Sequence, residues 1–199
     1  MKIIGITGYA KAGKDAVGEM LRLGLDNKDT LDKISNNILC DDDYLYTTHW
    51  HIHKFTEPLK QVLYDLIPTK HYCEYEELKT KEVYPGVTGR EMLQFVGTEI
   101  GRKLYPNIWV DLLIDSLNPN SQAIITDVRF PNEVEAIKAK GGIIIRKMEP
   151  IGYKPMEHES EAYIKELDYN FMIPWFDTME ELREYMKEFL SIIYKYMKE

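Results

Sequence analysis

The stretch KIIGITGYAKAGKD, residues 2–15, decides the fold. The segment from Lys2 to Thr7 is a short β-branched run, which predicts a buried strand. The following residues, Gly8 to Lys14, fit the pattern G-x-x-x-x-G-K. Next comes AVGEMLRLGL, in which apolar residues recur at helical spacing. The sequence therefore predicts a strand, a glycine loop and a helix in direct succession, which is the arrangement of a phosphate-binding loop.

Three features of this loop favour a polyphosphate ligand. Its glycines let backbone N–H groups turn toward phosphates, and the helix that begins near Lys14 directs its positive end at them. Lys14 adds a mobile ammonium for the β- and γ-phosphates. The alternative is an accidental glycine turn before a helix, which the preceding β-branched strand disfavours.

Asp15 stands where Ser or Thr is usual in this pattern. A carboxylate repels phosphates unless a cation intervenes, so Asp15 is expected to meet Mg²⁺, directly or through water. A second interpretation is that Asp15 caps the N-terminus of the helix, because capping favours the same residue type.

The rest of the chain indicates one α/β domain. Its 199 residues are 44% hydrophobic, which is enough for a sizeable core. Residues 122–127 read as a strand, 131–140 as a helix opened by Pro131, and 143–148 as another strand, so this βαβ unit implies parallel pairing. The alternation predicts a three-layer α/β domain with a mostly parallel central sheet flanked by helices.

Asp127 ends the predicted strand at 122–127, and Arg129 follows it. The carboxyl ends of parallel strands form the ligand crevice, so Asp127 lies near the glycine loop if the two strands are neighbours. There it would hold Mg²⁺ or orient an acceptor, or it would be an ordinary turn former at a strand end. Arg129 would donate hydrogen bonds from its planar guanidinium to a phosphate, or form a structural ion pair with Glu133.

Thr88 is predicted to cap one long helix from Gly89 to about Tyr105. At 100° per residue its apolar face comprises Met92, Leu93, Val96, Ile100 and Leu104. The opposite arc holds side chains suited to a phosphorylated ligand, with Gly97 at its edge: Arg90, Gln94, Thr98, Gly101 and Arg102. Glycines destabilise a helix interior by about 1 kcal/mol each relative to Ala, so they imply either ligand access or tight helix packing. Trp109, beyond this helix, is a core residue or a platform on which a base stacks. The core is favoured because aromatic residues dominate protein cores.

The net charge of −8 argues against a protein that coats a nucleic-acid polymer or an anionic membrane. The acidic excess is concentrated in the C-terminal part and in residues 26–43, a polar stretch expected to be an exposed excursion or a mobile flap. No stretch approaches the roughly 20 apolar residues of a membrane helix, and the N-terminus leads into a strand, so the expected location is the cytoplasm.

Several blocks together resemble the deoxynucleoside monophosphate kinases of tailed bacteriophages. These blocks are GYAKAGKD (8–15), FTEPLK (55–60), GREMLQFVGTEIGRKLYPNIWVDLL (89–113), ITDVRFPNEVEAI (125–137) and HESE (158–161). The resemblance runs over most of the chain, with these blocks in the same order. The resemblance implies a single P-loop kinase domain over residues 1–199, with a helical substrate-binding part around residues 56–118. It also implies the host cytoplasm if a phage encodes the protein.

The resemblance further implies transfer of the ATP γ-phosphoryl group to a deoxynucleoside 5′-monophosphate, with Mg²⁺. Residues that would hold ATP are Gly8, Tyr9, Ala10, Lys11, Ala12, Gly13, Lys14, Asp15 and Ala16. Candidates for the monophosphate side or the transition state are Lys11, Arg90, Gln94, Thr98, Arg102, Trp109, Asp127, Arg129 and Glu133. Asp15 and Asp127 are the metal candidates.

In the expected mechanism, Lys14 and Mg²⁺ act on the transferred group, and Arg129 with Arg90 or Arg102 bridges the two phosphates. Its small-molecule partners are nucleotides, and the sequence leaves open whether the protein forms a homodimer. The alternatives are another small-molecule P-loop kinase, of the phosphomevalonate or dephospho-coenzyme A type, and a nucleotide-binding switch that transfers nothing.

Overall fold

The computed structural model describes residues 1–26, 49–67, 80–155 and 159–197. They form two compact units, one made of Met1–His53 with Leu117–Glu199 and the other of Lys54–Ser116. Apart from residue 26, the predicted excursion at 26–43 lies outside the described residues.

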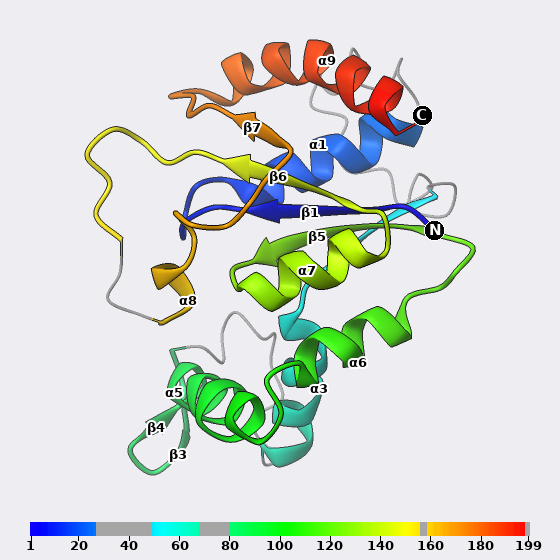
Figure 1. The fold of residues 1–199 in the computed structure, drawn as a ribbon. Coiled ribbons are helices and arrows are strands. Elements are labelled where there is room, and N and C mark those ends of the chain that lie inside the picture. The colour runs from blue at the N-terminus through cyan, green and yellow to red at the C-terminus, as the bar shows by residue number, and fades with distance from the viewer. Residues whose placement is uncertain (27–48, 68–79, 156–158, 198–199) are drawn as a thin grey trace. The chain divides into compact units, whose positions relative to one another are not determined.

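The first unit contains a five-stranded sheet (Figure 1). Its strands are β1 (Ile3–Thr7), β2 (Trp50–His53), β5 (Gln122–Val128), β6 (Ile143–Lys147) and β7 (Phe171–Ile173), in the order β2-β5-β1-β6-β7. Each neighbouring pair is parallel. The predicted α/β class with a parallel sheet is confirmed.

Strand β1 is the centre of the sheet because it pairs on both sides. Ile4 is in register with Ile124 of β5 and with Ile143 of β6. All residues of β1 are buried, as expected for a strand covered on both faces. The chain passes from β1 to β2 and β5 on one side and then to β6 and β7 on the other. The carboxyl end of β1 is therefore the point at which the topology switches direction, where open α/β sheets bind ligands.

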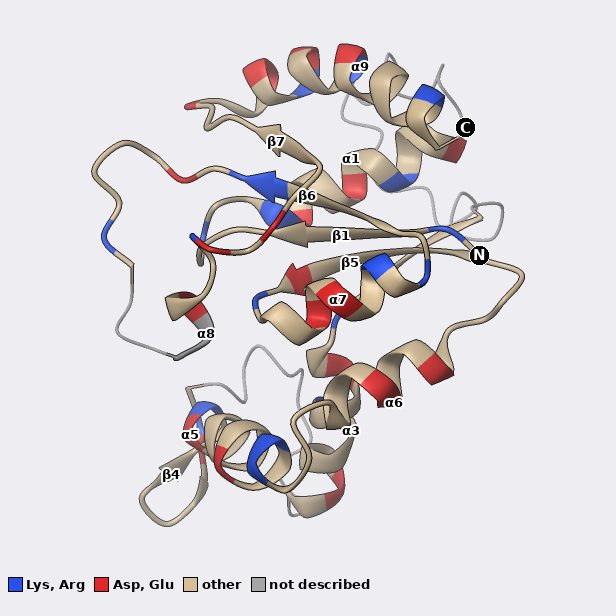
Figure 2. Ribbon diagram, viewed as in Figure 1, with Lys and Arg blue, Asp and Glu red and all other residues tan. Residues whose placement is uncertain are grey.

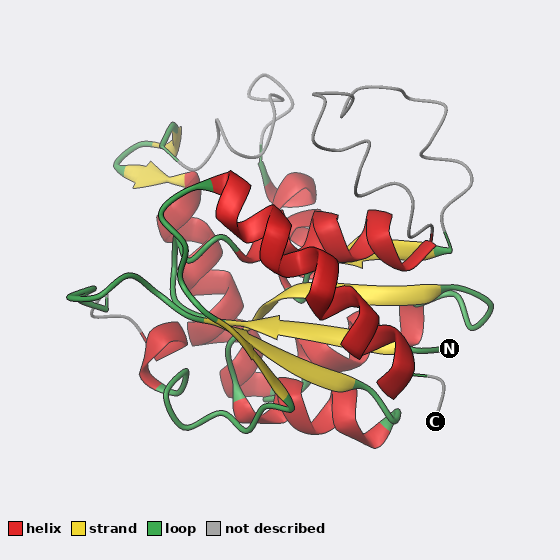
Figure 3. Ribbon diagram, turned by 90° about the horizontal axis from the view of Figure 1, so that it is seen from above, coloured by secondary structure: helices red, strands yellow, loops and turns green. Residues whose placement is uncertain are grey.

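Helices cover both faces of this sheet (Figures 1 and 3). The helices α1 (Lys14–Asp26) and α9 (Met179–Tyr196) lie on one face, where their apolar residues share a core cluster with Ile4 and Ile6. The helix α7 (Pro131–Ala139) lies on the other face, against Gly5, which alternates with those isoleucines along β1. The result is the predicted three-layer arrangement, which is that of a P-loop kinase fold.

Two glycines bring the layers close together. A Cβ atom at Gly5 would lie 2.7 Å from Cδ1 of Ile137 on α7, so the sheet approaches this helix with no space for a side chain. A Cβ atom at Gly18 of α1 would lie 2.5 Å from Cγ2 of Thr126 on β5. Because of this second approach, the first turns of α1 pack directly on the end of β5.

The final helix begins with a capping box. The hydroxyl of Thr178 accepts the N–H of Glu181, whose carboxylate accepts the N–H of Thr178, which completes a capping box. A short helix, α8 (Glu159–Ala162), precedes β7.

The second unit is mainly helical. It contains α3 (Thr56–Leu66), the hairpin strands β3 (Glu82–Tyr84) and β4 (Val87–Thr88), α5 (Gly89–Gln94), the π-helix η3 (Phe95–Arg102) and α6 (Ile108–Ser116). Its core is built on Leu59, Leu63 and Trp109. Across the described parts of both units, no helix is both long enough and apolar enough to cross a bilayer.

Candidate active site

The loop between β1 and α1 has the backbone conformation that its glycines predict. Gly8 has a φ of 146° and Gly13 a φ of 86°, both in the region that favours glycine. A Cβ atom at Gly8 would also collide with the carbonyl oxygen of Lys147 in the neighbouring strand β6. Lys11 has a φ of 63°, which is uncommon for a residue with a side chain. The loop therefore has a tightly constrained path at the carboxyl end of β1.

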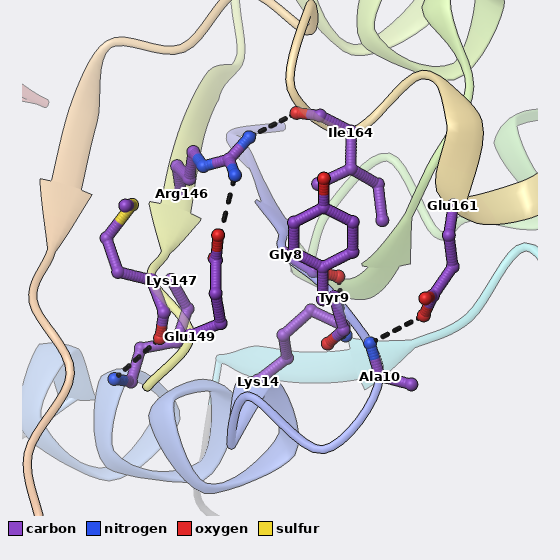
Figure 4. A network of polar contacts seen from close by, with 10 residues as sticks. Gly8, Tyr9, Ala10, Lys14, Arg146, Lys147, Glu149, Glu161 and Ile164 are labelled. Atoms are coloured by element: carbon purple, nitrogen blue, oxygen red, sulfur yellow. Dashed lines mark hydrogen bonds and ion pairs between the residues drawn. The ribbon is translucent and has the colours of Figure 1, made fainter. Parts of the chain in front are cut away.

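Lys14 is the first residue of α1, and its side chain folds back over the loop (Figure 4). Its ammonium donates hydrogen bonds to the carbonyl oxygens of Gly8, at 2.8 Å, and Tyr9, at 2.7 Å. Burial and repulsion from Arg129 lower the pKa of Lys14 to about 8, although the charges of Asp15, Asp127 and Glu161 oppose the shift. A phosphate bound next to this side chain would stabilise its charged form and so raise its pKa.

The two predicted metal ligands lie on adjacent elements of this unit. Asp15 is in the first turn of α1, where its Oδ1 accepts the hydroxyl of Thr126 at 2.7 Å. Asp127 follows Thr126 in β5, opposite the irregular pairing of β1 with β5 at Thr7. Their charges both act on Lys14, so the structure brings the two carboxylates to the same end of the sheet.

These carboxylates fit Mg²⁺, which is usually held by one or two carboxylates, water and substrate phosphates. The described residues contain no group of three or more His, Cys, Asp or Glu side chains placed to hold a metal by themselves. A magnesium ion at Asp15 and Asp127 would therefore depend on nucleotide phosphates for its remaining ligands.

Arg129 lies in the turn between β5 and α7. Its backbone N–H donates to Oε2 of Glu133 at 2.7 Å, and the N–H of Phe130 donates to the same oxygen at 3.1 Å. Glu133, which is buried, thus closes the N-terminus of α7. These hydrogen bonds give Glu133 a capping role, and its predicted contact with substrate stays a prediction.

The side chain of Arg129 faces a residue that the sequence analysis does not include in the site. Its Nη1 lies 3.5 Å from Oε1 of Glu161 on α8, and the same oxygen accepts the N–H of Ala10 in the glycine loop at 2.8 Å. Figure 4 shows Glu161 pointing at Ala10. The HESE block contains Glu161, but its sequence alone indicates only a helix start with acids in its first turn.

Basic residues of β6 complete this end of the sheet (Figures 2 and 4). Arg146 is buried, donates to the carbonyl of Ile164 and lies 3.6 Å from the carboxylate of Glu149. Its guanidinium is 5.8 Å from the ring centre of Tyr9. The ammonium of Lys147 donates to the carbonyl of Pro174 at 2.6 Å, and burial lowers its pKa to about 8. Both basic side chains thus donate to backbone carbonyls of later segments of the same unit.

The predicted ligand-binding arc of the second unit lies on α5 and η3. Arg90 and Gln94 are exposed, and Thr98 and Arg102 are partly exposed. Thr88 caps α5 as predicted, with its hydroxyl accepting the N–H of Glu91 at 3.3 Å. The helix continues beyond Gln94 as predicted, but Phe95–Arg102 form a π-helix, so the 100° step used for its faces does not apply there.

The π-helix changes which side chains face the core. Ile100 is 49% exposed and Leu104 79% exposed, so neither belongs to a buried apolar face as predicted. Gly97 and Gly101 are buried instead. A Cβ atom at Gly101 would lie 2.5 Å from Cζ2 of Trp109, whose indole N–H donates to the carbonyl of Gly97 at 2.9 Å. Of the two explanations for these glycines, tight packing is therefore correct, and Trp109 is a core residue.

The sequence of the chain is similar to those of several viral proteins. The chain is 30% identical over 148 residues to an Acanthamoeba polyphaga mimivirus protein provisionally named a deoxynucleotide monophosphate kinase, with 64% of this chain and 76% of that protein covered. It is 47% identical over 55 residues to the deoxynucleoside-5′-monophosphate kinase of Escherichia phage T5, covering 26% of this chain and 22% of that protein. A shorter similarity, 35% over 85 residues, links 39% of the chain to 37% of an uncharacterized protein of Ictalurid herpesvirus 1. No family profile matches the chain.

The parallel sheet with a lysine-bearing glycine loop after its central strand is consistent with the α/β P-loop kinase fold, and the names of the relatives indicate a phosphotransferase. Within that class, the chain belongs to the deoxynucleoside monophosphate kinase family of viruses, as its similarity to the mimivirus and phage proteins shows.

Proposed function

We propose that this protein transfers the γ-phosphoryl group of ATP to a deoxynucleoside 5′-monophosphate and releases ADP and the deoxynucleoside diphosphate. The observation that carries the proposal is the position of Lys14. Its buried ammonium bridges two carbonyls of the glycine loop at the point where the sheet topology reverses. Membership in the deoxynucleoside monophosphate kinase family supplies the class of acceptor.

In this proposal the loop from Gly8 to Ala16 binds the ATP phosphates. Backbone N–H groups at the start of α1 face the phosphate oxygens, and the ammonium of Lys14 leaves the carbonyls of Gly8 and Tyr9 to contact the transferred group. The exchange is favourable because a phosphate oxyanion is a stronger partner for a buried ammonium than a neutral carbonyl.

Asp15 and Asp127 would hold Mg²⁺ together with the ATP phosphates. When bound, the ion neutralises charge on the transferred phosphoryl group. The hydroxyl of Thr126 fixes the orientation of the Asp15 carboxylate through its 2.7 Å hydrogen bond.

The acceptor needs no strong general base, since its attacking atom is already a phosphate oxyanion. What the reaction needs is in-line placement and cations that offset the repulsion between two phosphates. We assign Arg129 and Lys11 in the first unit, and Arg90 or Arg102 in the second, to this role. Gln94 and Thr98 are proposed to contact the monophosphate from the same helical arc.

A coupled assay of ADP release, run with Mg²⁺ and ATP, tests the proposal. The acceptors are dAMP, dCMP, dGMP, dTMP and the corresponding ribonucleotides. ADP release that depends on at least one deoxynucleoside monophosphate is expected. Release at the same rate without any acceptor would contradict the proposal and favour an ATP-hydrolysing switch.

A further inference from the structure

Glu161 is a buried carboxylate in contact with the glycine loop. Its side chain is 1% exposed, and its Oε1 accepts the N–H of Ala10 at 2.8 Å and lies 3.5 Å from Nη1 of Arg129. Burying a carboxylate is costly unless polar partners compensate for the lost water. Both of these partners belong to segments to which the proposed function gives a role in binding phosphates. The buried charge therefore connects the loop to the turn that carries Arg129.

The contact with Ala10 also orients one peptide group of the loop. The carbonyl of Tyr9 and the N–H of Ala10 belong to the same planar peptide, and in the trans form they point in opposite directions. Lys14 donates to that carbonyl at 2.7 Å, while Glu161 accepts from that N–H at 2.8 Å. In this ligand-free structure an ammonium on one side and a carboxylate on the other thus hold the peptide in one orientation. When Lys14 turns to a phosphate, the contact with Glu161 is the one that keeps this orientation.

Glu161 is itself held in place by further residues. Tyr153 lies in the segment between β6 and α8, with its ring 5.4 Å from that of Tyr9, and burial and then the charge of Glu161 raise the pKa of its phenol. Arg129 is fixed at its backbone by Glu133 and approached at its guanidinium by Glu161. The carboxylate therefore meets three separate segments that converge at the carboxyl end of β1.

We infer that Glu161 is a positioning residue, which orients the Tyr9–Ala10 peptide and the Arg129 guanidinium for phosphoryl transfer. This inference rests on the proposed function. Glu161 contacts no phosphate in this account and acts through the two groups that do. The competing interpretation is a carboxylate that contributes to stability alone.

Three substitutions at Glu161 separate its effect on the Tyr9–Ala10 peptide from its effect on the Arg129 guanidinium. Glu161→Gln keeps an oxygen that can accept the Ala10 N–H but removes the charge beside Arg129. We expect kcat to fall by about 10- to 100-fold, because misplacement of a catalytic group by about 1 Å has costs of this size, while KM for ATP changes less than about threefold. Glu161→Asp, which keeps the charge, should recover part of kcat. Glu161→Ala removes both contacts and should also weaken ATP binding.

Glu149→Gln is the matched control. Glu149 is also a carboxylate near Tyr9, but the basic residue it pairs with is Arg146, at 3.6 Å. Its substitution should leave kcat within about threefold of wild type. Thermal unfolding of every variant shows whether an effect on kcat comes from loss of structure. An equal fall of kcat in both Gln variants, or unchanged kcat with a lower Tm in Glu161→Gln, would overturn the inference.

A double-mutant cycle with Arg129→Ala identifies the residue through which the charge acts. If Glu161 acts through Arg129, Glu161→Gln should lower kcat by less than about twofold in the Arg129→Ala background. Full additivity of the two substitutions would overturn the inference.

Calorimetric measurement of ATP binding distinguishes a failure of this inference from a failure of the proposed function. If the wild-type protein phosphorylates no deoxynucleoside monophosphate, the proposed function fails. Weaker ATP binding by Glu161→Ala than by Glu149→Gln would still support the loop-positioning part of the inference. Equal affinity in the two variants would overturn it.

Discussion

The hydroxyl of Thr126 donates a hydrogen bond of 2.7 Å to Oδ1 of Asp15 and so joins the end of β5 to the first turn of α1. Thr126 is buried, and its methyl group packs at the close approach of Gly18. The residue that precedes Asp127 in β5 therefore orients the carboxylate of Asp15, which follows Lys14. Both proposed magnesium ligands depend on the same short segment of β5.

This relationship predicts the effect of Thr126→Val. Valine keeps the shape but leaves the Asp15 oxygen without this donor, which should cost about 1 kcal/mol of stability and raise the Mg²⁺ concentration needed for half-maximal activity. Titration of activity with Mg²⁺ measures the effect. Thr126→Ser keeps the hydroxyl, and a Mg²⁺ requirement raised equally in both variants would show that the hydrogen bond is not responsible.

Lys14→Ala should abolish most turnover and leave the fold intact. The lowered pKa of Lys14 means that the charged side chain is destabilised in the ligand-free protein, so its removal should not lower Tm near neutral pH. Initial rates and thermal unfolding of the same preparation check both statements. Near-normal activity in this variant would contradict the assignment of Lys14 to the transferred phosphoryl group.

Binding of ATP should weaken as the pH rises above about 8. The pKa of Lys14 in the free protein is about 8, and bound phosphates raise it, so above pH 8 each bound nucleotide must take up a proton. Affinity then falls by up to about tenfold per pH unit until the pH reaches the pKa of the complex. Calorimetric titrations at several pH values test this dependence. In Lys14→Arg, whose guanidinium stays charged, the decline should be absent, and an identical decline would assign it to another group.

Arg90→Ala should raise KM for the monophosphate more than KM for ATP. Arg90 is exposed at the start of α5 and lies in the arc proposed to contact the acceptor. Steady-state kinetics with each substrate varied in turn measure the two constants. Glu99→Ala, at another exposed position of the same helical segment, is the control, and an effect of Arg90→Ala confined to ATP would reverse the assignment.

Gly101→Ala should destabilise the second unit by about 1–3 kcal/mol. The added Cβ would lie 2.5 Å from Trp109, which is fixed by its hydrogen bond to Gly97. This strain exceeds the gain of about 1 kcal/mol that alanine brings to a helix interior. Denaturant unfolding followed by tryptophan fluorescence measures the change. A variant more stable than wild type would show that the contact relaxes at no cost.

Local sequence signals predicted the parts of the fold that depend on neighbouring residues. The β-branched strand, the glycine spacing around Lys14 and the helix cap at Thr88 all have the predicted structure. Their causes lie within a few residues of each other, in steric limits on φ and in unsatisfied N–H groups at helix ends.

Other features depend on contacts between distant residues and were not predictable in this way. The π-helix shifts the helical register where Gly97 and Gly101 pack on Leu59 and Trp109, so a fixed 100° step places Ile100 and Leu104 incorrectly. Glu161 lies 151 residues beyond Ala10 in the chain, and only the folded sheet brings them together. Nothing in the spacing of its own segment indicates that contact.

Transfer of a label from ATP tests the central claim most directly. The protein is incubated with Mg²⁺, a deoxynucleoside monophosphate and ATP labelled at its γ-phosphorus, and the products are separated by chromatography. The account predicts that the label appears in the β-phosphate of the deoxynucleoside diphosphate, and that Lys14→Ala yields almost none of this product. Label found only in inorganic phosphate, at a rate independent of the acceptor, would contradict the account.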